Sequence, residues 1–322
     1  MRGIRWLERH QVAAFLAAIG VGVVVGLAAP AVAPSLEAGI TPVLAVLLFA
    51  TFLGVPLAQI GRAFRDIRFL VVVLATNFVL VPVVVFGLSR FVAGDEALLI
   101  GVLLVLLTPC VDYVIVFTGL AGGAKQRLLA ATPLLMLLQL LVLPVYLWLF
   151  AGPEAADLIE PGPFIEAFVV LILLPLIAAA LVQWWARQTP SGRTVERVFL
   201  AAMVPLMMAT LAIVVGSQVA AVGGELARLG AVIPLYVAFL VIMLGLGIVI
   251  GRMSRLDVPA TRALVFSGAT RNSLVVLPFA LALPDALALV SIVVVTQTLV
   301  ELVGMVIFVR VVPLVVPHRS RA

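Results

Sequence analysis

This sequence has few charged residues. Only 11% of its 322 residues are charged, whereas 65% are hydrophobic. A soluble domain has roughly a quarter of its residues charged. One soluble core cannot hide so many apolar side chains, so the composition excludes an ordinary soluble globular protein. It predicts instead a helical protein that crosses the lipid bilayer several times.

Cysteine and histidine are also nearly absent. The single cysteine excludes a disulfide within the chain, and one cysteine with two histidines offers no spacing typical of a zinc site. No pair of acids or histidine cluster favours catalysis, so we expect neither an enzyme nor a cofactor. The net charge of +5 does not indicate binding to nucleic acid, because Lys and Arg of membrane proteins gather in the cytoplasmic connectors.

Long apolar runs fill the chain. A helix needs about 20 apolar residues to cross about 30 Å of hydrocarbon. Runs of this kind predict ten membrane-spanning helices, at 11–29, 40–59, 68–90, 97–121, 128–150, 164–186, 197–219, 229–251, 262–283 and 286–309. Every second connector is basic, and those between are neutral or acidic. The positive-inside rule then predicts a multi-pass protein of the cell (plasma) membrane with both termini in the cytoplasm.

A long acidic loop, AGPEAADLIEPGPF, divides the ten predicted spans into five and five. Because five is odd, two homologous halves would have opposite orientations in the membrane. We therefore predict an all-α fold of two inverted five-helix repeats, residues 1–151 and 164–322, with an extracytoplasmic connector at 152–163. Inverted repeats are common in secondary transporters, whose sites lie near the bilayer midplane on broken helices.

Three charged residues fall inside predicted spans. They are Asp112 in the fourth span, Arg271 in the ninth and Glu301 in the tenth. Each costs about 2.5–3.5 kcal/mol at the centre of a lone helix. We therefore expect all three to face a partner or a water-filled cavity.

The fourth and ninth spans also contain residues that interrupt helices. Pro109 lacks a backbone donor and disfavours helical geometry at Thr108. The ninth span, around SGATRNSLVVLP, collects residues that tolerate or hydrogen-bond unwound backbone, namely Gly268, Thr270 and Asn272. The two spans hold equivalent positions in the two halves. We predict that they are discontinuous and cross, which would bring Asp112 close to Arg271.

The side chains at this predicted crossing have more than one interpretation. An Asp112–Arg271 ion pair would either hold the crossing together or line the transport pathway. Cys110 would be either a small buried residue or a ligand of the cargo. Glu301 has no spare basic partner, which favours a role in ion coupling, and Gln297 lies one helical turn before it on the same face.

Two stretches, TPCVDYVIVFTGLAGG and TQTLVELVGM, resemble the arsenite-efflux permeases of arsenical-resistance systems. These permeases belong to the bile acid:sodium symporter superfamily, and the resemblance spans nearly the whole chain. It implies the ten-span inverted-repeat fold, with Cys110 as the essential cysteine and Glu301 as the essential glutamate. The chain departs from the family at Asp112 and Tyr113, which follow the cysteine where small or apolar residues are usual. In the ninth span Arg271 replaces an amide, and an acid is missing.

The resemblance implies a secondary active transporter that extrudes arsenite, As(III), with antimonite as a similar cargo, in exchange for protons. Such a protein would confer arsenic resistance. The side chains expected to bind substrate are Cys110, Asp112, Arg271 and Asn272, with the Cys110 thiolate on the transported arsenic. The expected coupling group is Glu301, supported by Gln297 and Thr270.

An alternative keeps the fold and changes the cargo to an organic anion taken up with sodium, as in the superfamily's other branch. Sodium would then be held by oxygens of Thr270, Asn272, Gln297 and Glu301, and Arg271 would pair with the carboxylate of the substrate. An intramembrane enzyme or a sensor is disfavoured, because the sequence shows neither a catalytic cluster nor a soluble domain. The sequence leaves open the cargo, the coupling ion, the direction of transport, and a monomer or a homodimer.

Overall fold

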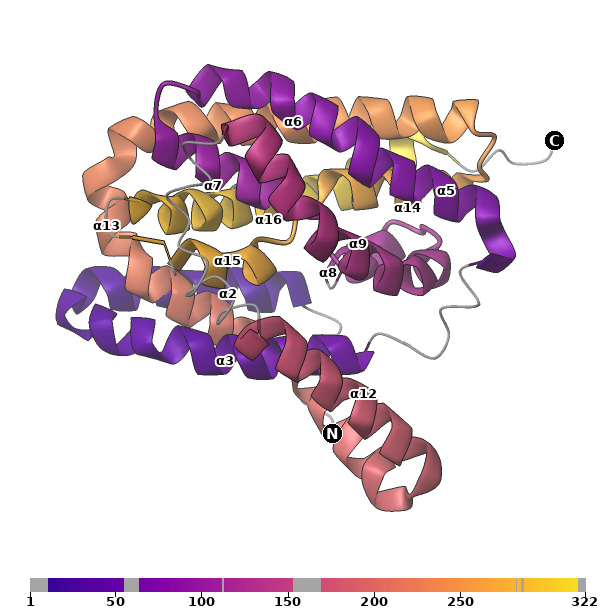
Figure 1. Cartoon of the computed structure of the whole chain (residues 1–322), viewed down its shortest axis with the longest axis horizontal. Helices are drawn as coiled ribbons and strands as arrows, with labels where there is room; N and C mark the ends of the chain where they lie inside the picture. Colours follow the sequence, from indigo (N-terminus) through magenta and orange to yellow (C-terminus); the bar gives the residue numbers. More distant parts are fainter. Residues whose placement is uncertain are drawn as a thin grey trace. The chain divides into compact units, whose positions relative to one another are not determined.

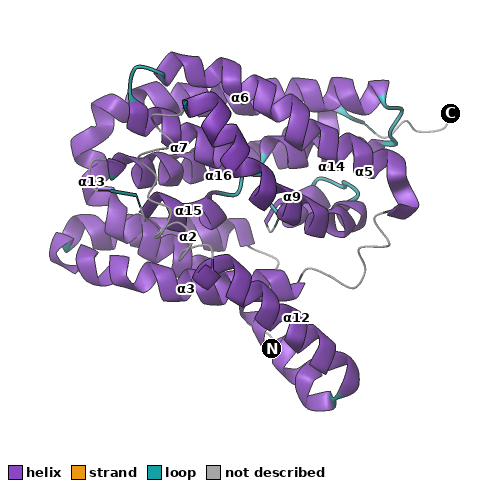
Figure 2. Ribbon diagram, viewed as in Figure 1, coloured by secondary structure: helices purple, strands orange, loops and turns teal. Residues whose placement is uncertain are grey.

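The computed structural model describes residues 11–54, 64–111, 113–152, 169–281, 283–284 and 287–317. This part of the chain is almost entirely helical, and no β-strand occurs in it (Figure 2). Within the described ranges, short turns connect helices that follow one another along the sequence (Figure 1). The apolar composition therefore produces the helical backbone expected of a chain that must satisfy its own hydrogen bonds in lipid.

The elements before residue 153 include two spans that change helix type along their length. In chain order they are α2 (Gln11–Ala28), η1 (Pro30–Val32), α3 (Ala33–Gly54), η3 (Phe64–Asp66), α5 (Ile67–Ala75), η4 (Thr76–Leu80), α6 (Val81–Ser89), η5 (Arg90–Val92), α7 (Glu96–Leu106), α8 (Tyr113–Leu120) and α9 (Lys125–Ala151). After residue 168 they are η6 (Val169–Leu173), α12 (Leu174–Gln188), α13 (Pro190–Met253), α14 (Val258–Ala269), α15 (Ser273–Leu281) and α16 (Leu289–Val315). Both η4 and η6 are π-helical turns.

Five helical stretches in the described part are long and apolar enough to cross a membrane. They are Pro30–Gly54, Ile67–Val92, Pro190–Val219, Arg228–Met253 and Leu289–Val315. A sixth is added if the two parts of α9, Lys125–Gln139 and Leu141–Ala151, form one bent span. Together they indicate a multi-pass membrane protein. The number falls short of ten partly because the predicted spans 97–121 and 262–283 are each divided into two shorter helices, so ten spans stay a prediction.

The helix α13 contains two of these stretches, Pro190–Val219 and Arg228–Met253, at the places where we expected separate spans at 197–219 and 229–251. The segment between them, where we expected a connector, is helical as well. The intervening sequence contains Glu, Ala, Leu and Arg, which favour helix, and it lacks proline. Two glycines there weaken the helix without ending it.

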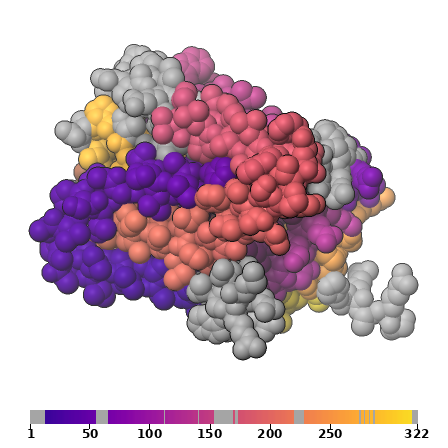
Figure 3. Space-filling view, turned by 90° about the horizontal axis from the view of Figure 1, so that it is seen from below, coloured from indigo at the N-terminus to yellow at the C-terminus, as the bar shows by residue number. Residues whose placement is uncertain are grey.

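The first of two compact units consists of Met1–Val55 and Pro161–Ala227. Glycine allows α2 and α13 to approach closely, because a Cβ atom at Gly22 would lie 2.6 Å from the carbonyl oxygen of Ala212. The indigo N-terminal segment accordingly lies against the salmon segment near residue 200 in the space-filling view (Figure 3). Small residues at helix contacts are typical of membrane proteins, in which packing rather than hydrophobicity holds helices together.

The second compact unit consists of Pro56–Glu160 and Arg228–Ala322. Two of its helices, α7 and α14, are buried on all sides over ten consecutive residues each, Ala97–Leu106 and Ala260–Ala269. A helix that is apolar and covered all round lies at the centre of a bundle. The helix α16 lies beside α7 (Figure 1), so the centre of this unit is formed by α7, α14 and α16.

Each unit combines a segment from the N-terminal half of the chain with one from the C-terminal half. The predicted repeats, 1–151 and 164–322, therefore do not coincide with the compact units. A repeat defined by ancestry need not form a compact unit by itself, so these boundaries stay a prediction.

Candidate functional site

Two interrupted helices meet in the second unit. One interruption separates α7 from α8, and the other separates α14 from α15. The Cys110 N–H donates to the Thr270 carbonyl at 3.3 Å. In the opposite direction, the Asn272 N–H donates to the Thr108 carbonyl at 2.8 Å. The two unwound stretches thus satisfy each other's backbone groups, which the interior of a membrane requires.

Side-chain chemistry accounts for both interruptions. Thr108 donates its hydroxyl to the Leu104 carbonyl at 2.8 Å, and Pro109 after it has no N–H with which to continue the helix. Thr270 likewise donates its hydroxyl to a carbonyl of the last turn of α14. An isolated antiparallel bridge pairs Pro109 with Arg271 across the crossing. We call the two unwound stretches, 107–111 and 270–272, the crossing.

Asn272 and Gly268, which we expected in the break between α14 and α15, lie in different parts of the structure. Asn272 caps α15, because its Oδ1 accepts the N–H of Val275 at 3.2 Å. Gly268 differs from the prediction, since it lies inside α14 and not in the interruption. A Cβ atom there would lie 3.0 Å from Cε of Met243 and 3.3 Å from Cγ2 of Thr76, so Gly268 lies at a close side-chain contact.

Glu301 reaches the crossing from α16. Its side chain is only 1% exposed, and its Oε1 accepts the Tyr113 hydroxyl at 2.6 Å. Its Oε2 accepts the backbone N–H of Arg271 at 2.8 Å and the side-chain amide of Gln297. The carboxylate therefore connects α8, α16 and the crossing through three hydrogen bonds.

The guanidinium of Arg271 contacts uncharged oxygens. Nη2 lies 2.9 Å from Oδ1 of Asn77, 2.7 Å from the carbonyl oxygen of Ser267 and 2.8 Å from that of Gly268. Nη1 lies 3.4 Å from the Leu106 carbonyl oxygen. Arg271 is completely buried, so these dipoles replace water around its charge.

The crossing brings together most side chains singled out from the sequence. Those within its network are Thr108, Pro109, Cys110, Thr270, Arg271, Asn272, Gln297 and Glu301. Asp112 lies outside the described residues, so its pairing with Arg271 stays a prediction. Cys110 is fully buried at the crossing and, as the only cysteine, offers at most one sulfur ligand.

Sequence reasoning missed Asn77. This residue lies in the π-helical turn η4, where its Nδ2 donates to the Val73 carbonyl and to Oγ of Ser267, both at 3.0 Å. Single π-helical turns are frequent at functional sites. A signal was available, because Thr76 and Asn77 are polar residues in an otherwise apolar run shortly before Pro82.

Three buried polar atoms at the crossing and on α16 have no hydrogen-bond partner among the described residues. They are Nε of Arg271, Nδ2 of Asn272 and Oε1 of Gln297. An unpaired buried polar group costs about 1–3 kcal/mol. Atoms left in this state indicate a place for water, an ion or a polar solute. The site therefore offers a thiol, amides, a hydroxyl and a carboxylate around unwound backbone.

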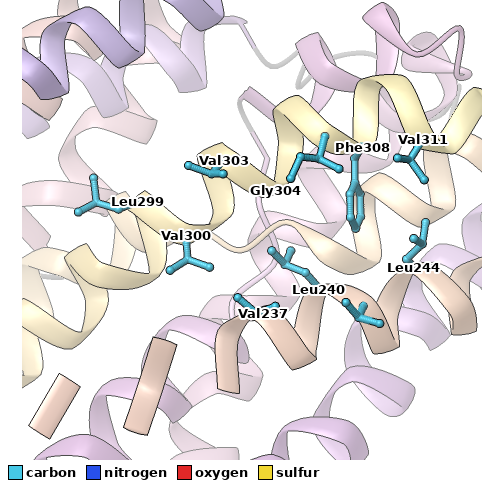
Figure 4. Close-up of a pocket in the computed structure, with 11 residues that line it drawn as sticks. Val237, Leu240, Leu244, Leu299, Val300, Val303, Gly304, Phe308 and Val311 are labelled. Carbon is cyan, nitrogen blue, oxygen red and sulfur yellow. The ribbon is translucent and has the colours of Figure 1, made fainter. Parts of the chain in front are cut away.

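A separate cavity of about 530 Å³ lies between the later part of α13 and α16 (Figure 4). Only apolar residues line it, among them Val237, Leu240 and Leu244 of α13 and Val303 and Phe308 of α16. Such a lining gives a small polar solute nothing to bind, and it suits the lipid-facing side of membrane helices. We therefore place the candidate site at the crossing.

Comparison with known proteins gives two matches. A sequence model of the family described as "Sodium Bile acid symporter family" matches residues 41–227, which is more than half of the chain. The chain is also 24% identical over 256 residues to the protein named "Uncharacterized sodium-dependent transporter YocS" from Bacillus subtilis (strain 168). That alignment covers 78% of this chain and 76% of the Bacillus protein.

Proposed function

This chain belongs to the sodium bile acid symporter family, whose members are transporters and not enzymes, and on that premise we propose that it extrudes arsenite in exchange for protons. Antimonite is the expected second cargo. The observation that supports the proposal most is the convergence of Cys110 and Glu301 on the crossing. There the cargo and the coupling ion would meet at groups connected by a few hydrogen bonds.

The groups around the crossing favour a neutral cargo. Arsenite is a neutral trihydroxide at neutral pH, and its arsenic binds the soft sulfur of a thiolate. One sulfur from Cys110, with oxygen ligands beside it, would hold arsenic loosely enough for release, as transport requires. The guanidinium of Arg271 already contacts oxygens of the protein, which argues against its binding the carboxylate of an organic anion.

Glu301 is the proposed coupling group. As a carboxylate it accepts hydrogen bonds from Tyr113, from the Arg271 N–H and from Gln297. Protonation makes one carboxylate oxygen a donor and a weaker acceptor, so the hydrogen bonds that this oxygen receives are weakened or rearranged. Because the Arg271 N–H belongs to the crossing, a proton on Glu301 would act directly on the stretch that holds Cys110. Each charge that crosses the membrane gains about 2.3 kcal/mol per 100 mV.

We also propose the ten-span inverted repeat in the cell membrane, with both termini in the cytoplasm. The compact units support it, because each takes equivalent predicted spans from the two halves. The first unit contains the first and second spans of each half, and the second unit contains the third, fourth and fifth spans of each half. The interrupted helices add support. Asp95 caps α7 and pairs with Arg228, while Asp257 caps α14 and pairs with Arg127. Alternating access would follow from one bundle rocking against the crossing.

The second candidate is uptake of an organic anion with sodium. It is favoured by the family description and by the name of the Bacillus relative, both of which specify sodium. The ion would bind between the carboxylate of Glu301 and Oε1 of Gln297, an atom without a partner among the described residues. The direction of transport would then be inward.

Arsenite flux in proteoliposomes, with proton and sodium gradients imposed separately, tests the two candidates. We expect an acidic lumen to drive arsenite uptake, a protonophore to abolish it, and a sodium gradient to leave it unchanged. Flux that needs sodium and ignores the protonophore would favour the second candidate. Flux no greater than that of empty liposomes under either gradient would contradict arsenite as the cargo.

A further inference from the structure

Three oxygens converge on one nitrogen atom in the second unit. Nη2 of Arg271 lies within 2.7–2.9 Å of Oδ1 of Asn77 and of the carbonyl oxygens of Ser267 and Gly268. A guanidinium nitrogen of this type carries two hydrogens, so three acceptors at such distances cannot each receive a separate one. The arrangement is a shell of oxygens around a centre of positive charge. We call Asn77 Oδ1 and the two carbonyl oxygens the oxygen shell.

The partners in the oxygen shell are not the groups that fit arginine best. Carboxylates and phosphates are, because their two oxygens match its planar fork. Among the residues that the structure describes, every partner of the guanidinium is a neutral amide or peptide oxygen, and Arg271 is completely buried. Neutral oxygens gathered in this way are typical of sites for small, hard cations.

The position of the Ser267 and Gly268 carbonyls also suits a cation site. Ser267 and Gly268 lie in the last turn of α14, where carbonyls lack partners within the helix and the helix dipole is negative. Leu106, which contacts Nη1, is the last residue of α7. The carboxyl ends of both interrupted helices thus supply oxygens to one cation. Ends of broken helices commonly coordinate ions in membrane transporters.

Asn77 completes the oxygen shell from a third helix. Its Nδ2 donates to the Val73 carbonyl and to Oγ of Ser267, and these two bonds fix which end of the amide faces Arg271. The π-helical turn at Thr76–Leu80 adds a residue to the helix at this point and redirects the side chain.

We propose that the oxygen shell is a binding site for a monovalent cation of the size of sodium, and that the guanidinium of Arg271 occupies it as a cation tethered to the chain. The site is then permanently filled. A mobile ion is not needed to hold the carboxyl end of α14 against Asn77, and ion exchange is confined to Glu301. The inference depends on the local geometry alone, whichever cargo is transported.

Removing the tethered cation should make the protein depend on a free one. The wild-type protein in sodium, potassium and choline chloride at equal ionic strength gives the baseline, which includes the effect of any sodium bound at Glu301 and Gln297. The Arg271→Ala variant should unfold at a lower temperature in choline chloride. Sodium should then raise that temperature in a saturable manner, by about 5 °C, since a ligand that binds only the folded state stabilises it.

Two variants make this test specific. Asn77→Ala in the Arg271→Ala background removes one oxygen from the shell and should abolish the effect of sodium. Arg262→Ala is the matched control, because Arg262 is also a buried arginine bound to carbonyl oxygens, those of Ala121 and Val316, without three oxygens on one nitrogen. Its loss should lower the unfolding temperature equally in all three salts.

The result that overturns the proposal is a folded Arg271→Ala variant whose unfolding temperature is the same in sodium and choline chloride. If the Arg271→Ala variant cannot be purified in folded form in choline chloride, the same purification in sodium chloride tests the proposal instead. Recovery in sodium alone supports the proposal, and failure in both salts contradicts it. Because arsenite is absent throughout, these outcomes are independent of those that test the proposed cargo.

Discussion

At the scale of single residues, the hydroxyl of Tyr113 connects Glu301 to α8. It lies 2.6 Å from Oε1 of Glu301 and 3.2 Å from the Arg271 carbonyl oxygen. Its ring also packs edge-on against Phe117, with the centroids 6.2 Å apart. Removal of the hydroxyl therefore changes the network around the carboxylate while the ring can keep its packing.

We predict that Tyr113→Phe lowers proton-driven arsenite flux about tenfold or more, because a hydrogen bond to a charged group contributes about 1.5–3 kcal/mol. Flux in proteoliposomes, normalised to the amount of folded protein, measures the effect. Tyr236→Phe is the control. The buried hydroxyl of Tyr236 donates at 3.1 Å to the Val293 carbonyl and not to Glu301. Equal flux of Tyr113→Phe and wild type would remove Tyr113 from the coupling network.

Residues of the site differ in how far the sequence could predict them. Glu301 and Arg271 are charges inside apolar runs, and their cost alone indicates buried partners. The partners themselves were not predictable: Tyr113 is 188 residues from Glu301, and Asn77 is 194 residues from Arg271. Contacts at such separations depend on how the helices pack, and no local pattern encodes them.

At the scale of elements, the contact between α7 and α16 supports the crossing. A Cβ atom at Gly101 would lie 2.6 Å from Cγ1 and 2.8 Å from Cβ of Val293. Both helices are covered there, so neither can move away without disturbing its other neighbours. No local pattern distinguishes this glycine from the others of the chain, so the close contact was not predictable.

We predict that Gly101→Ala lowers the free energy of unfolding by about 1–3 kcal/mol, the usual cost of overpacking. Gly87→Ala in α6 is the matched control. A Cβ atom there meets nothing within 4 Å, so the higher helix propensity of alanine should stabilise the protein by up to about 1 kcal/mol. Thermal unfolding in detergent distinguishes the two variants, and similar shifts for both would contradict the close contact.

An ion pair lies at the start of α7. Asp95 accepts the N–H of Leu98 at 3.2 Å and pairs with Arg228. Partial burial raises the pKa of Asp95. Hydrogen bonds from Arg228 and from backbone N–H groups, together with the positive charge of Arg228, lower it by more, so the pKa lies below its ordinary value of 3.8. Stability from a lowered pKa is present above pH 3.8 and is lost as the pH falls through the lower, folded-state value.

We predict that Asp95→Asn lowers the unfolding temperature at neutral pH, where the wild type has the full ion pair. The difference between the two proteins should shrink as the pH falls below 3.8, because the wild-type carboxylate is then protonated. Unfolding temperatures of both proteins across this range provide the measurement. A difference that is constant with pH would show that the charge of Asp95 is irrelevant to stability.

The interruptions were the most predictable elements. Pro109 and the polar residues of the ninth span indicated breaks in two long apolar runs. Other features were not predictable. Gly268 has the composition of a break but lies inside α14, because the chain unwinds two residues later, where Thr270 donates its hydroxyl back to the helix. The π-helical turn at Thr76–Leu80 has no sequence pattern of its own.

At the scale of the whole molecule, both halves of the chain contribute to each compact unit. The crossing takes α7 and α8 from one half and α14 and α15 from the other. An inverted repeat produces such a pairing naturally, since equivalent spans then approach the midplane from opposite sides. The family assignment fits this organisation and leaves the cargo to be determined by experiment.

In the proposed mechanism, Cys110 binds the cargo and Glu301 couples its transport to protons. The most direct measurement compares net arsenite uptake driven by an acidic lumen with exchange of internal for external arsenite without a gradient, in the same proteoliposomes. We predict that Cys110→Ser abolishes both, while Glu301→Gln abolishes net uptake and keeps exchange. Net uptake by Glu301→Gln, or exchange by Cys110→Ser at the wild-type rate, would contradict the account.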